Sequence, residues 1–135
     1  MGRVVLGGLL AGLIINISEA ILNMRVLGKQ MEEAMASHNF PAFSDTMIIW
    51  FIIFGFLLGI ASVWLYAGIR PRYNPGSKTA IIAGIAVWFF AYFYPGIGFI
   101  VMGWFPLNMM LISLVWGFFE VIIAIQAGAW LYKEA

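Results

Sequence analysis

Four long apolar stretches constrain the fold of this chain more than any other feature of its sequence. Of its 135 residues, 64% are hydrophobic and only 10% are charged, which lies outside the usual composition of a soluble domain. A helix that crosses a membrane needs about 20 mainly apolar residues, so the chain has room for four or five such helices. We predict an all-α integral membrane four-helix bundle in which residues 1–135 form a single transmembrane domain.

Breaker sequences between the apolar stretches set the expected helix bounds. Residues 37–41 (SHNFP) and the basic loop 70–76 (RPRYNPG) interrupt the pattern. The candidate N-caps are Ser44 or Asp45 for the second span and Ser77 for the third. The first helix is expected to continue beyond the membrane as an amphipathic segment over about 25–36. The predicted spans are residues 4–24, 46–69, 78–94 and 107–132, with an irregular continuation of the third span to Met102.

The distribution of basic residues predicts the orientation of the bundle. Only Arg25 and Lys29 fall on the side of the first connection. Because cytoplasmic loops carry an excess of Lys and Arg, both termini should be cytoplasmic, as expected for a multi-pass protein of a bacterial inner membrane. The residues on the cytoplasmic side are Arg3, Arg70, Arg72, Lys78 and Lys133.

Several function classes find no support in the sequence. The net charge is +1, with no basic patch that would bind nucleic acid, and the chain has no cysteine. His38 is the only histidine and is interpreted as an ordinary loop residue. The HExxH, CxxC and GxSxG patterns and a phosphate-binding glycine loop are absent. We therefore expect neither an enzyme nor a bound metal or cofactor.

Two short similarities suggest an internal repeat. Residues 9–13 (LLAGL) resemble residues 81–85 (IIAGI), and the WLY sequence of residues 64–66 recurs at residues 130–132. With two spans in each unit, the two hairpins would have the same orientation in the membrane. A 2+2 hairpin arrangement is a possible interpretation, although short matches arise easily in so biased a composition.

Small and polar residues share one face of each predicted span. At 100° per residue, Gly8, Gly12, Asn16, Glu19 and Asn23 fall within an arc of about 80° on the first span. Small residues let helix backbones approach closely, and polar groups avoid lipid, so this face should point into the bundle. The corresponding packing residues of the other spans are Gly55 and Gly59 in the second, Gly84 in the third, and Gly117, beside Glu120, in the fourth.

Two carboxylates within the spans are the strongest candidates for chemistry. Counted along their helices, Glu19 and Glu120 differ in depth by about one turn, and their side chains lean toward each other because each points to the N-terminus of its own helix. Two bare anions would repel strongly there, so the pair should hold a shared proton or a cation. Alternatively, each protonated carboxyl group serves only as a hydrogen-bonding link to Asn16, Asn23 or Ser113.

Some sequence stretches resemble known membrane proteins. The run GLIINISEA of residues 12–20 and the run WLYAGIRPR of residues 64–72 resemble small bacterial membrane proteins of unknown activity. The size, the four spans, Glu19 and the run LISLVWGFF of residues 111–119 are also similar to small multidrug transporters. However, Glu19 lies late in its span, the matching run lies in the fourth span instead of the third, and the first loop is too long, so that family is not assigned.

Two functional hypotheses follow. The first is a non-enzymatic membrane protein that works as a homo-oligomer or as an accessory subunit of a larger membrane complex, because the chain offers abundant helix-packing surface and no soluble domain. The second is a small proton-coupled or cation-coupled transporter in which Glu19 and Glu120 exchange the ion.

Overall fold

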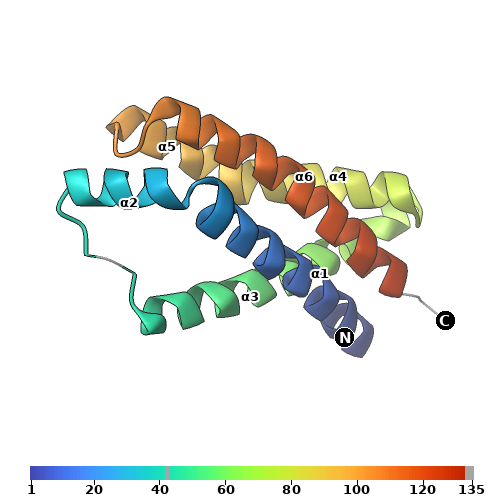
Figure 1. The fold of residues 1–135 in the computed structure, drawn as a ribbon. Coiled ribbons are helices and arrows are strands. Elements are labelled where there is room, and N and C mark those ends of the chain that lie inside the picture. Colours follow the sequence, from blue (N-terminus) through green and yellow to red (C-terminus); the bar gives the residue numbers. More distant parts are fainter. Residues whose placement is uncertain (42, 133–135) are drawn as a thin grey trace.

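The computed structural model describes residues 1–41 and 43–132, and these residues form helices and short connections, with no strand among them. Four segments of the described chain are long and apolar enough to cross a membrane, as the sequence predicts. Figure 1 shows them as a bundle in which the start of α1 and the end of α6 lie at the same end. The elements are α1 (Gly2–Ile21), α2 (Gly28–Ser37), α3 (Asp45–Tyr73), α4 (Ser77–Trp88), α5 (Tyr94–Met102) and α6 (Leu107–Leu131), with π-helical turns η1 (Leu22–Val26) and η2 (Phe89–Phe93).

The helix α1 crosses α3 at a contact made of glycines. A Cβ atom added to Gly59 would lie 2.6 Å from the Cα atom of Gly12, and one added to Gly12 would lie 2.7 Å from the Cα atom of Phe56. A Cβ atom at Gly8 would meet the backbone nitrogen of Ile60 at 2.9 Å. No side chain fits between the two backbones here, so the glycines allow the two helices to touch directly.

A second close contact joins α1 to α6. A Cβ atom at Gly128 would lie 2.8 Å from the carbonyl oxygen of Gly7. The buried side chain of Val63, on α3, packs against both glycines. The helix α1 is therefore held between α3 and α6 near the end of the bundle where the chain begins.

The helix α4 packs on α6 less closely than α1 packs on α3. A Cβ atom at Gly84 would lie 3.3 Å from the Cα atom of Ile122. In the possible repeat, Gly84 and Ile122 correspond to Gly12 and Phe56, because they lie 72 and 66 residues further along the chain. The same shift of 66 residues separates the two WLY sequences. The internal repeat itself stays a prediction.

The helix α3 is longer than expected at its end. It continues through Pro71 to Tyr73, so the interpretation of residues 70–73 as loop is wrong. The turn that follows is closed by side chains: the backbone N–H of Gly76 donates to the Tyr66 hydroxyl at 3.1 Å, and Thr79 Oγ1 donates to the carbonyl oxygen of Tyr73 at 3.0 Å. These bonds hold the chain at the helix end although Pro71 removes one helical hydrogen bond.

The two predicted N-caps have different outcomes. Ser44 accepts a hydrogen bond from the backbone N–H of Met47 at 3.2 Å, so its prediction as the N-cap of α3 is confirmed. Ser77 is the first residue of α4 and makes no such cap, because Gly76 occupies the N-cap position.

Two π-helical turns interrupt the long helices. After α1, η1 leads into α2, which Figure 1 shows turned away from the axis of α1. The buried Leu22 and Leu27 pack with Met109 of α6 at this bend. In the third span, η2 directly precedes α5, whose first turn contains Pro95. The wider π turn relieves the clash that a proline ring causes in a regular helix, which explains why the helix continues to Met102.

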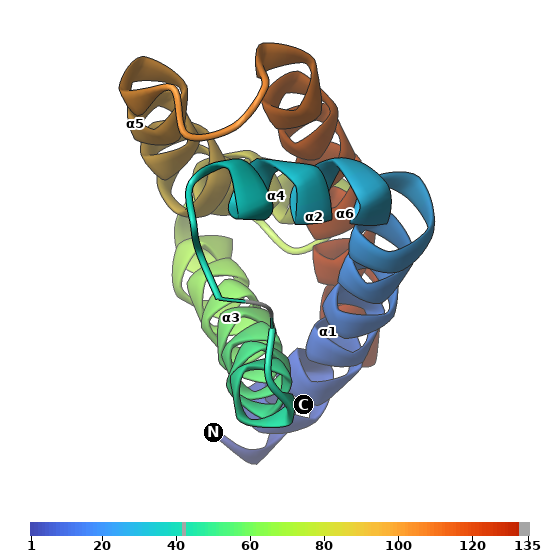
Figure 2. The ribbon, with the colours of Figure 1, turned by 60° about the vertical axis from the view of Figure 1, so that its left-hand side comes forward.

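The beginning of α3 lies apart from the rest of the bundle. Every residue from Asp45 to Phe54 is exposed, and Figure 2 shows this part of α3 standing away from α6. The hydrogen bond from Asn16 Nδ2 to the Ile52 carbonyl oxygen, 3.2 Å long, lies near the point where α1 and α3 separate. Beyond it, α3 presents an apolar surface on all sides.

The substitution Gly59→Ala should destabilise the bundle by about 1–3 kcal/mol, because the new methyl group overpacks the crossing of α1 and α3. The free energy of unfolding, measured by denaturant titration in mild detergent micelles, checks this. Gly68→Ala on the same helix is the matched control, since a Cβ atom there meets nothing within 4 Å, and it should leave stability unchanged or slightly raised. Equal effects of the two substitutions would contradict the close crossing.

Candidate functional site

The carboxyl groups of Glu19 and Glu120 lie next to each other between α1 and α6. Glu120 is only 4% exposed, and Glu19 is half-buried. The antiparallel course of the two helices brings together side chains that each lean toward their own N-terminus. The structure therefore brings together the two carboxylates of the long apolar helices that the sequence singles out.

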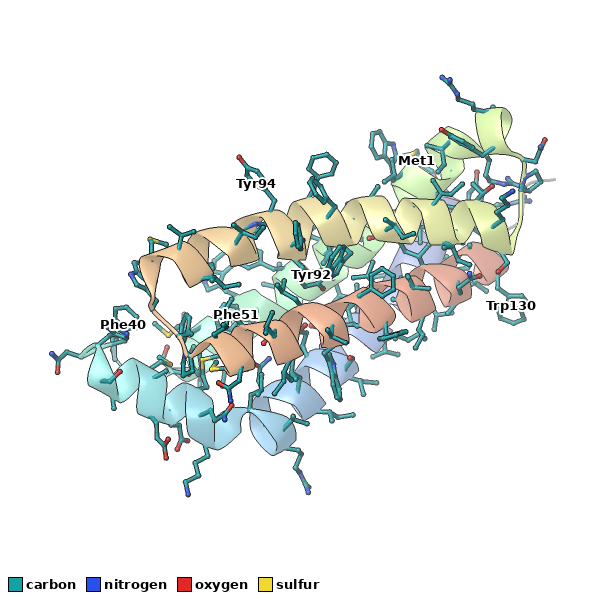
Figure 3. All side chains as sticks on the ribbon, turned by 90° about the horizontal axis from the view of Figure 1, so that it is seen from above. Met1, Phe40, Phe51, Tyr92, Tyr94 and Trp130 are labelled. Carbon is teal, nitrogen blue, oxygen red and sulfur yellow. The ribbon has the colours of Figure 1, made fainter. Side chains whose placement is uncertain are left out.

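A tyrosine from the third span completes the contacts of Glu120. The hydroxyl of Tyr92 donates to Glu120 Oε2 at 2.9 Å. Its ring lies over Gly117, where an added Cβ atom would meet the ring at 3.4 Å, so the glycine leaves the space that the ring occupies. In Figure 3, Tyr92 lies among the helices, whereas Tyr94 points away from them. Tyr92 therefore belongs to the interior of the bundle.

An asparagine holds Glu19 in place. Asn23 Nδ2 donates to both the Glu19 carbonyl oxygen at 2.9 Å and Glu19 Oε2 at 3.0 Å. Asn23 belongs to η1, and Tyr92 belongs to η2. Each of the two carboxyl groups thus has a hydrogen-bond donor on a π-helical turn, an irregularity that is frequent at functional sites.

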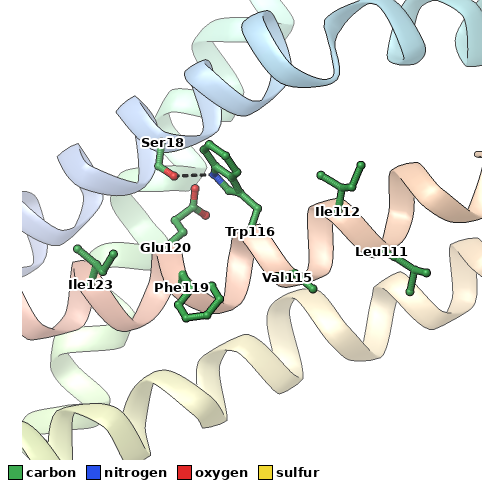
Figure 4. Close-up of a pocket in the computed structure, with 8 residues that line it drawn as sticks. All are labelled: Ser18, Leu111, Ile112, Val115, Trp116, Phe119, Glu120 and Ile123. Carbon is green, nitrogen blue, oxygen red and sulfur yellow. Dashed lines mark hydrogen bonds between the residues drawn. The ribbon is translucent and has the colours of Figure 1, made fainter.

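A serine and a tryptophan lie beside the carboxyl pair on the α1–α6 interface. Trp116 Nε1 donates to Ser18 Oγ at 2.8 Å, and Ser18 lies next to the carboxyl group of Glu120. Figure 4 shows the indole ring and the carboxyl group pointing from α6 toward Ser18. The hydrogen bond between Trp116 and Ser18 therefore links α1 and α6 next to the carboxyl pair.

One oxygen atom of the site is poorly satisfied. Glu120 Oε1 is buried and accepts no well-aligned hydrogen bond among the described residues, although Ser18 and Glu19 lie within hydrogen-bonding reach of the carboxyl group. In that same part of the chain, no arginine, lysine or histidine acts on the Glu120 carboxyl group. A buried carboxyl oxygen without a well-aligned donor is costly, so the site is suited to take up a proton or another hydrogen-bond donor.

Two other predicted site residues lie elsewhere. Asn16 is occupied at the crossing of α1 and α3, where its side chain covers Gly55 and donates to α3. Ser113 is seven residues from Glu120, which is about 10 Å along α6, and the structure gives its hydroxyl no bond to either carboxyl group. Within residues 1–41 and 43–132, no group of three or more acidic, histidine or cysteine side chains could hold a metal ion.

Comparisons with other proteins add no assignment. No protein-family model, no curated protein and no solved structure matches this chain. The function must therefore be argued from the residues of the site.

The substitution Tyr92→Phe should lower the free energy of unfolding by about 1–3 kcal/mol, because it removes the hydroxyl that donates to Oε2 of the buried Glu120 carboxyl group. Denaturant titration in detergent measures the loss. Tyr94→Phe, two residues away and 71% exposed, is the matched control and should change stability by less than about 0.5 kcal/mol. The loss should vanish in a Glu120→Ala background; its persistence would assign the effect to packing of the ring.

Proposed function

We propose that the protein is embedded in a bacterial cytoplasmic membrane by four spans, with both termini in the cytoplasm. The four long apolar helices support this topology, as does the charge distribution. Arg3, Arg72 and Lys78 lie at the end of the bundle that holds the start of α1, whereas Arg25 and Lys29 lie at the other end. Lys133, which contributes to the same expectation, lies outside the described residues.

We propose that the protein binds and exchanges a proton or a monovalent cation at the Glu19–Glu120 pair, as a small ion-coupled membrane transporter. The observation that supports this proposal is the meeting of the two carboxyl groups, where no basic group among the described residues acts on the buried Glu120. Ionisable groups inside a membrane bundle commonly mark ion or proton pathways. Chemical catalysis has no comparable support, so the proposed role is not enzymatic.

Charge balance explains why exchange at this pair would matter to the whole bundle. Two ionised carboxylates in a low dielectric repel each other, whereas one shared proton or one cation makes the pair attractive. The carboxyl groups belong to α1 and α6, so loss of the ion would push these two helices apart on the Trp116–Ser18 side. The donors Asn23 and Tyr92 lie on π turns, the irregular segments of their helices, and can follow such a movement.

Proteoliposomes that contain a pH-sensitive dye test this proposal. An imposed Na⁺ or K⁺ gradient should drive a proton flux through the wild-type protein that empty liposomes do not show. Glu19→Gln and Glu120→Gln should each reduce this flux by about tenfold or more, because each removes a charge from the pair while keeping its shape.

Glu32→Gln is the matched control for these variants, since it removes an equal charge from the exposed surface of α2. It should transport like the wild-type protein. Each variant is first shown to elute as the wild type does in size-exclusion chromatography, so that loss of flux is separated from loss of fold. A double Glu19→Gln/Glu120→Gln variant with undiminished flux would refute the coupling site.

A second proposal is that the protein works as an oligomer or as an accessory subunit of a membrane complex. The observation that favours it is the exposed first third of α3, where eight consecutive large apolar residues, Met47 to Phe54, contact little else in the bundle. An apolar helix surface on all sides is available to other membrane helices, with lipid as the competing neighbour.

Single cysteines introduced into this cysteine-free chain test the second proposal. Ile49→Cys, in the exposed part of α3, should form a disulfide-linked or cross-linker-bridged species in native membranes. Val115→Cys is the matched control, because its side chain is exposed to a similar degree on α6, 60% against 57%. A homogeneous monomer in mild detergent, with no bridged species from Ile49→Cys and no partner recovered by native purification, would rule out assembly through α3.

A further inference from the structure

The helix α2 lies across the end of the bundle that is away from both chain termini (Figure 1, Figure 2). Its exposed side carries Lys29, Glu32 and Glu33, and Ala34 is its one buried residue. Among the residues that the structure describes, no side-chain hydrogen bond or ion pair joins α2 to another helix. Apolar contacts alone therefore hold α2 on the bundle, and a rotation of the helix can break and remake them.

The corner between α1 and α2 has the form of a hinge. The π turn η1 ends at Val26, and Leu27, with φ −110° and ψ 0°, leads directly into α2. Gly28 allows this tight corner, because a Cβ atom there would lie 2.9 Å from the carbonyl oxygen of Asn23. Lids turn on a few residues at the ends of helices or loops that absorb changes in backbone torsion angles. The π turn and the two residues after it are such a segment.

An apolar cluster under this corner separates the carboxyl pair from the end of the bundle that α2 covers. Leu22, Leu27 and Met109 pack together in it, and each is at most 3% exposed. Leu22 follows Glu19 by three residues, or about one helical turn. The ring of Trp116, beside the carboxyl pair, packs against the same cluster. Water from this end of the bundle can therefore reach the pair between α1 and α6 only if the cluster opens.

The contact between α2 and the bundle is incomplete beyond this cluster. A cleft of about 410 Å³ lies between α2 and the connection from α5 to α6. Gln30, Glu33 and Ser37 line it from α2, and Trp104 and Asn108 line it from the other side. Gln30 Oε1 is buried and accepts no hydrogen bond within the described part of the chain. Because a buried acceptor without a donor is costly, hydration of this atom favours a position of α2 further from the bundle.

We infer that α2 is a lid, which turns about η1 and opens a water path from this end of the bundle to the carboxyl pair. The inference rests on the proposed ion exchange, since an ion that reaches Glu19 and Glu120 from this end must pass the cluster under α2. Opening carries Met31 of α2 away from the cluster and uncovers Met109 of α6. The hinge also contacts the pair, because Asn23 of η1 donates to Glu19 Oε2 at 3.0 Å.

Thiol labelling of single cysteines in this cysteine-free chain tests the movement of α2 without a transport measurement. Met109 is 1% exposed beneath the lid, so a membrane-impermeant maleimide should reach Met109→Cys only when α2 opens. In lipid nanodiscs this variant should label completely, but at least about tenfold more slowly than Glu32→Cys on the exposed side of α2. Adding Met31→Ala, which weakens the contact of the lid with the cluster, should speed the labelling about fivefold.

Val121→Cys is the matched control for burial. Val121 is 0% exposed and belongs to a different core cluster, with Tyr66 of α3, so opening of α2 does not uncover it. It should remain unlabelled over the time in which Met109→Cys labels completely. Size-exclusion chromatography of each variant shows first that the fold is kept.

A reducible cross-link tests whether the lid controls the carboxyl pair. Ser37→Cys and Asn108→Cys lie on opposite walls of the cleft, so dithiobis(maleimido)ethane can join α2 to α6 and hold the lid closed. The cation-driven proton flux should then fall by about tenfold or more, and cleavage with dithiothreitol should restore it. Glu33→Cys/Ser37→Cys is the matched control, because the same reagent then joins two residues of α2 and leaves the lid free to turn.

The outcomes distinguish the lid from the proposed function. Equal and complete protection of Met109→Cys and Val121→Cys, with no effect of Met31→Ala, would show that α2 is fixed, and would leave ion exchange at the pair intact. Undiminished flux through the cross-linked Ser37→Cys/Asn108→Cys protein would also overturn the lid. Labelling that shows opening of α2 in a protein without any proton flux would support the lid and refute transport at the pair.

Discussion

The direct backbone contact of α1 with α3 and α6 is the constraint on which the other features depend. Gly8 and Gly12 meet α3, and Gly7 meets Gly128 of α6, so α1 is fixed in position and rotation on two sides. Since Glu19 follows Gly12 by seven residues, or about two helical turns, the rotation set at the crossing also sets the direction of its side chain. The glycines thereby place one carboxyl group against the other, although none of them touches it.

Burial of the two carboxyl groups destabilises a bundle that has so few polar groups. The side chains around the pair reduce this destabilisation. Tyr92 and Asn23 each donate to one carboxyl group, and both lie on π turns. Ser18 and Trp116 satisfy each other on one side of the pair. One oxygen atom, Glu120 Oε1, accepts no well-aligned hydrogen bond among the described residues. A proton or a cation held between the two carboxyl groups would satisfy this atom, and this favours the binding of an ion at the pair.

Sequence reasoning succeeded where regular helical periodicity holds and failed where it does not. The stripe from Gly8 to Glu19 lies on the regular helix α1, so 100° per residue and the lean of side chains sufficed to predict that Glu19 points toward Glu120. In the third span, the same rule predicts that Ala91 points inward. The structure exposes Ala91 and turns Tyr92 inward, because the extra residue in a π turn rotates the following residues by about 100°. The spacing of residues in the sequence predicts neither the inward direction of Tyr92 nor the pairing of Ser18 with Trp116.

The π turn η2 also decides which face of α5 meets α6. Gly84 contacts Ile122, and Gly96 lies where a Cβ atom would come within 2.9 Å of the Leu114 side chain, so both glycines face α6. They are twelve residues apart, which in an uninterrupted α-helix would point them about 120° away from each other. Because η2 absorbs one residue, the effective separation is eleven, and their directions differ by only about 20°. The irregular turn therefore keeps Gly84 and Gly96 on the same face of the third span, so that α4 and the first turn of α5 both meet α6.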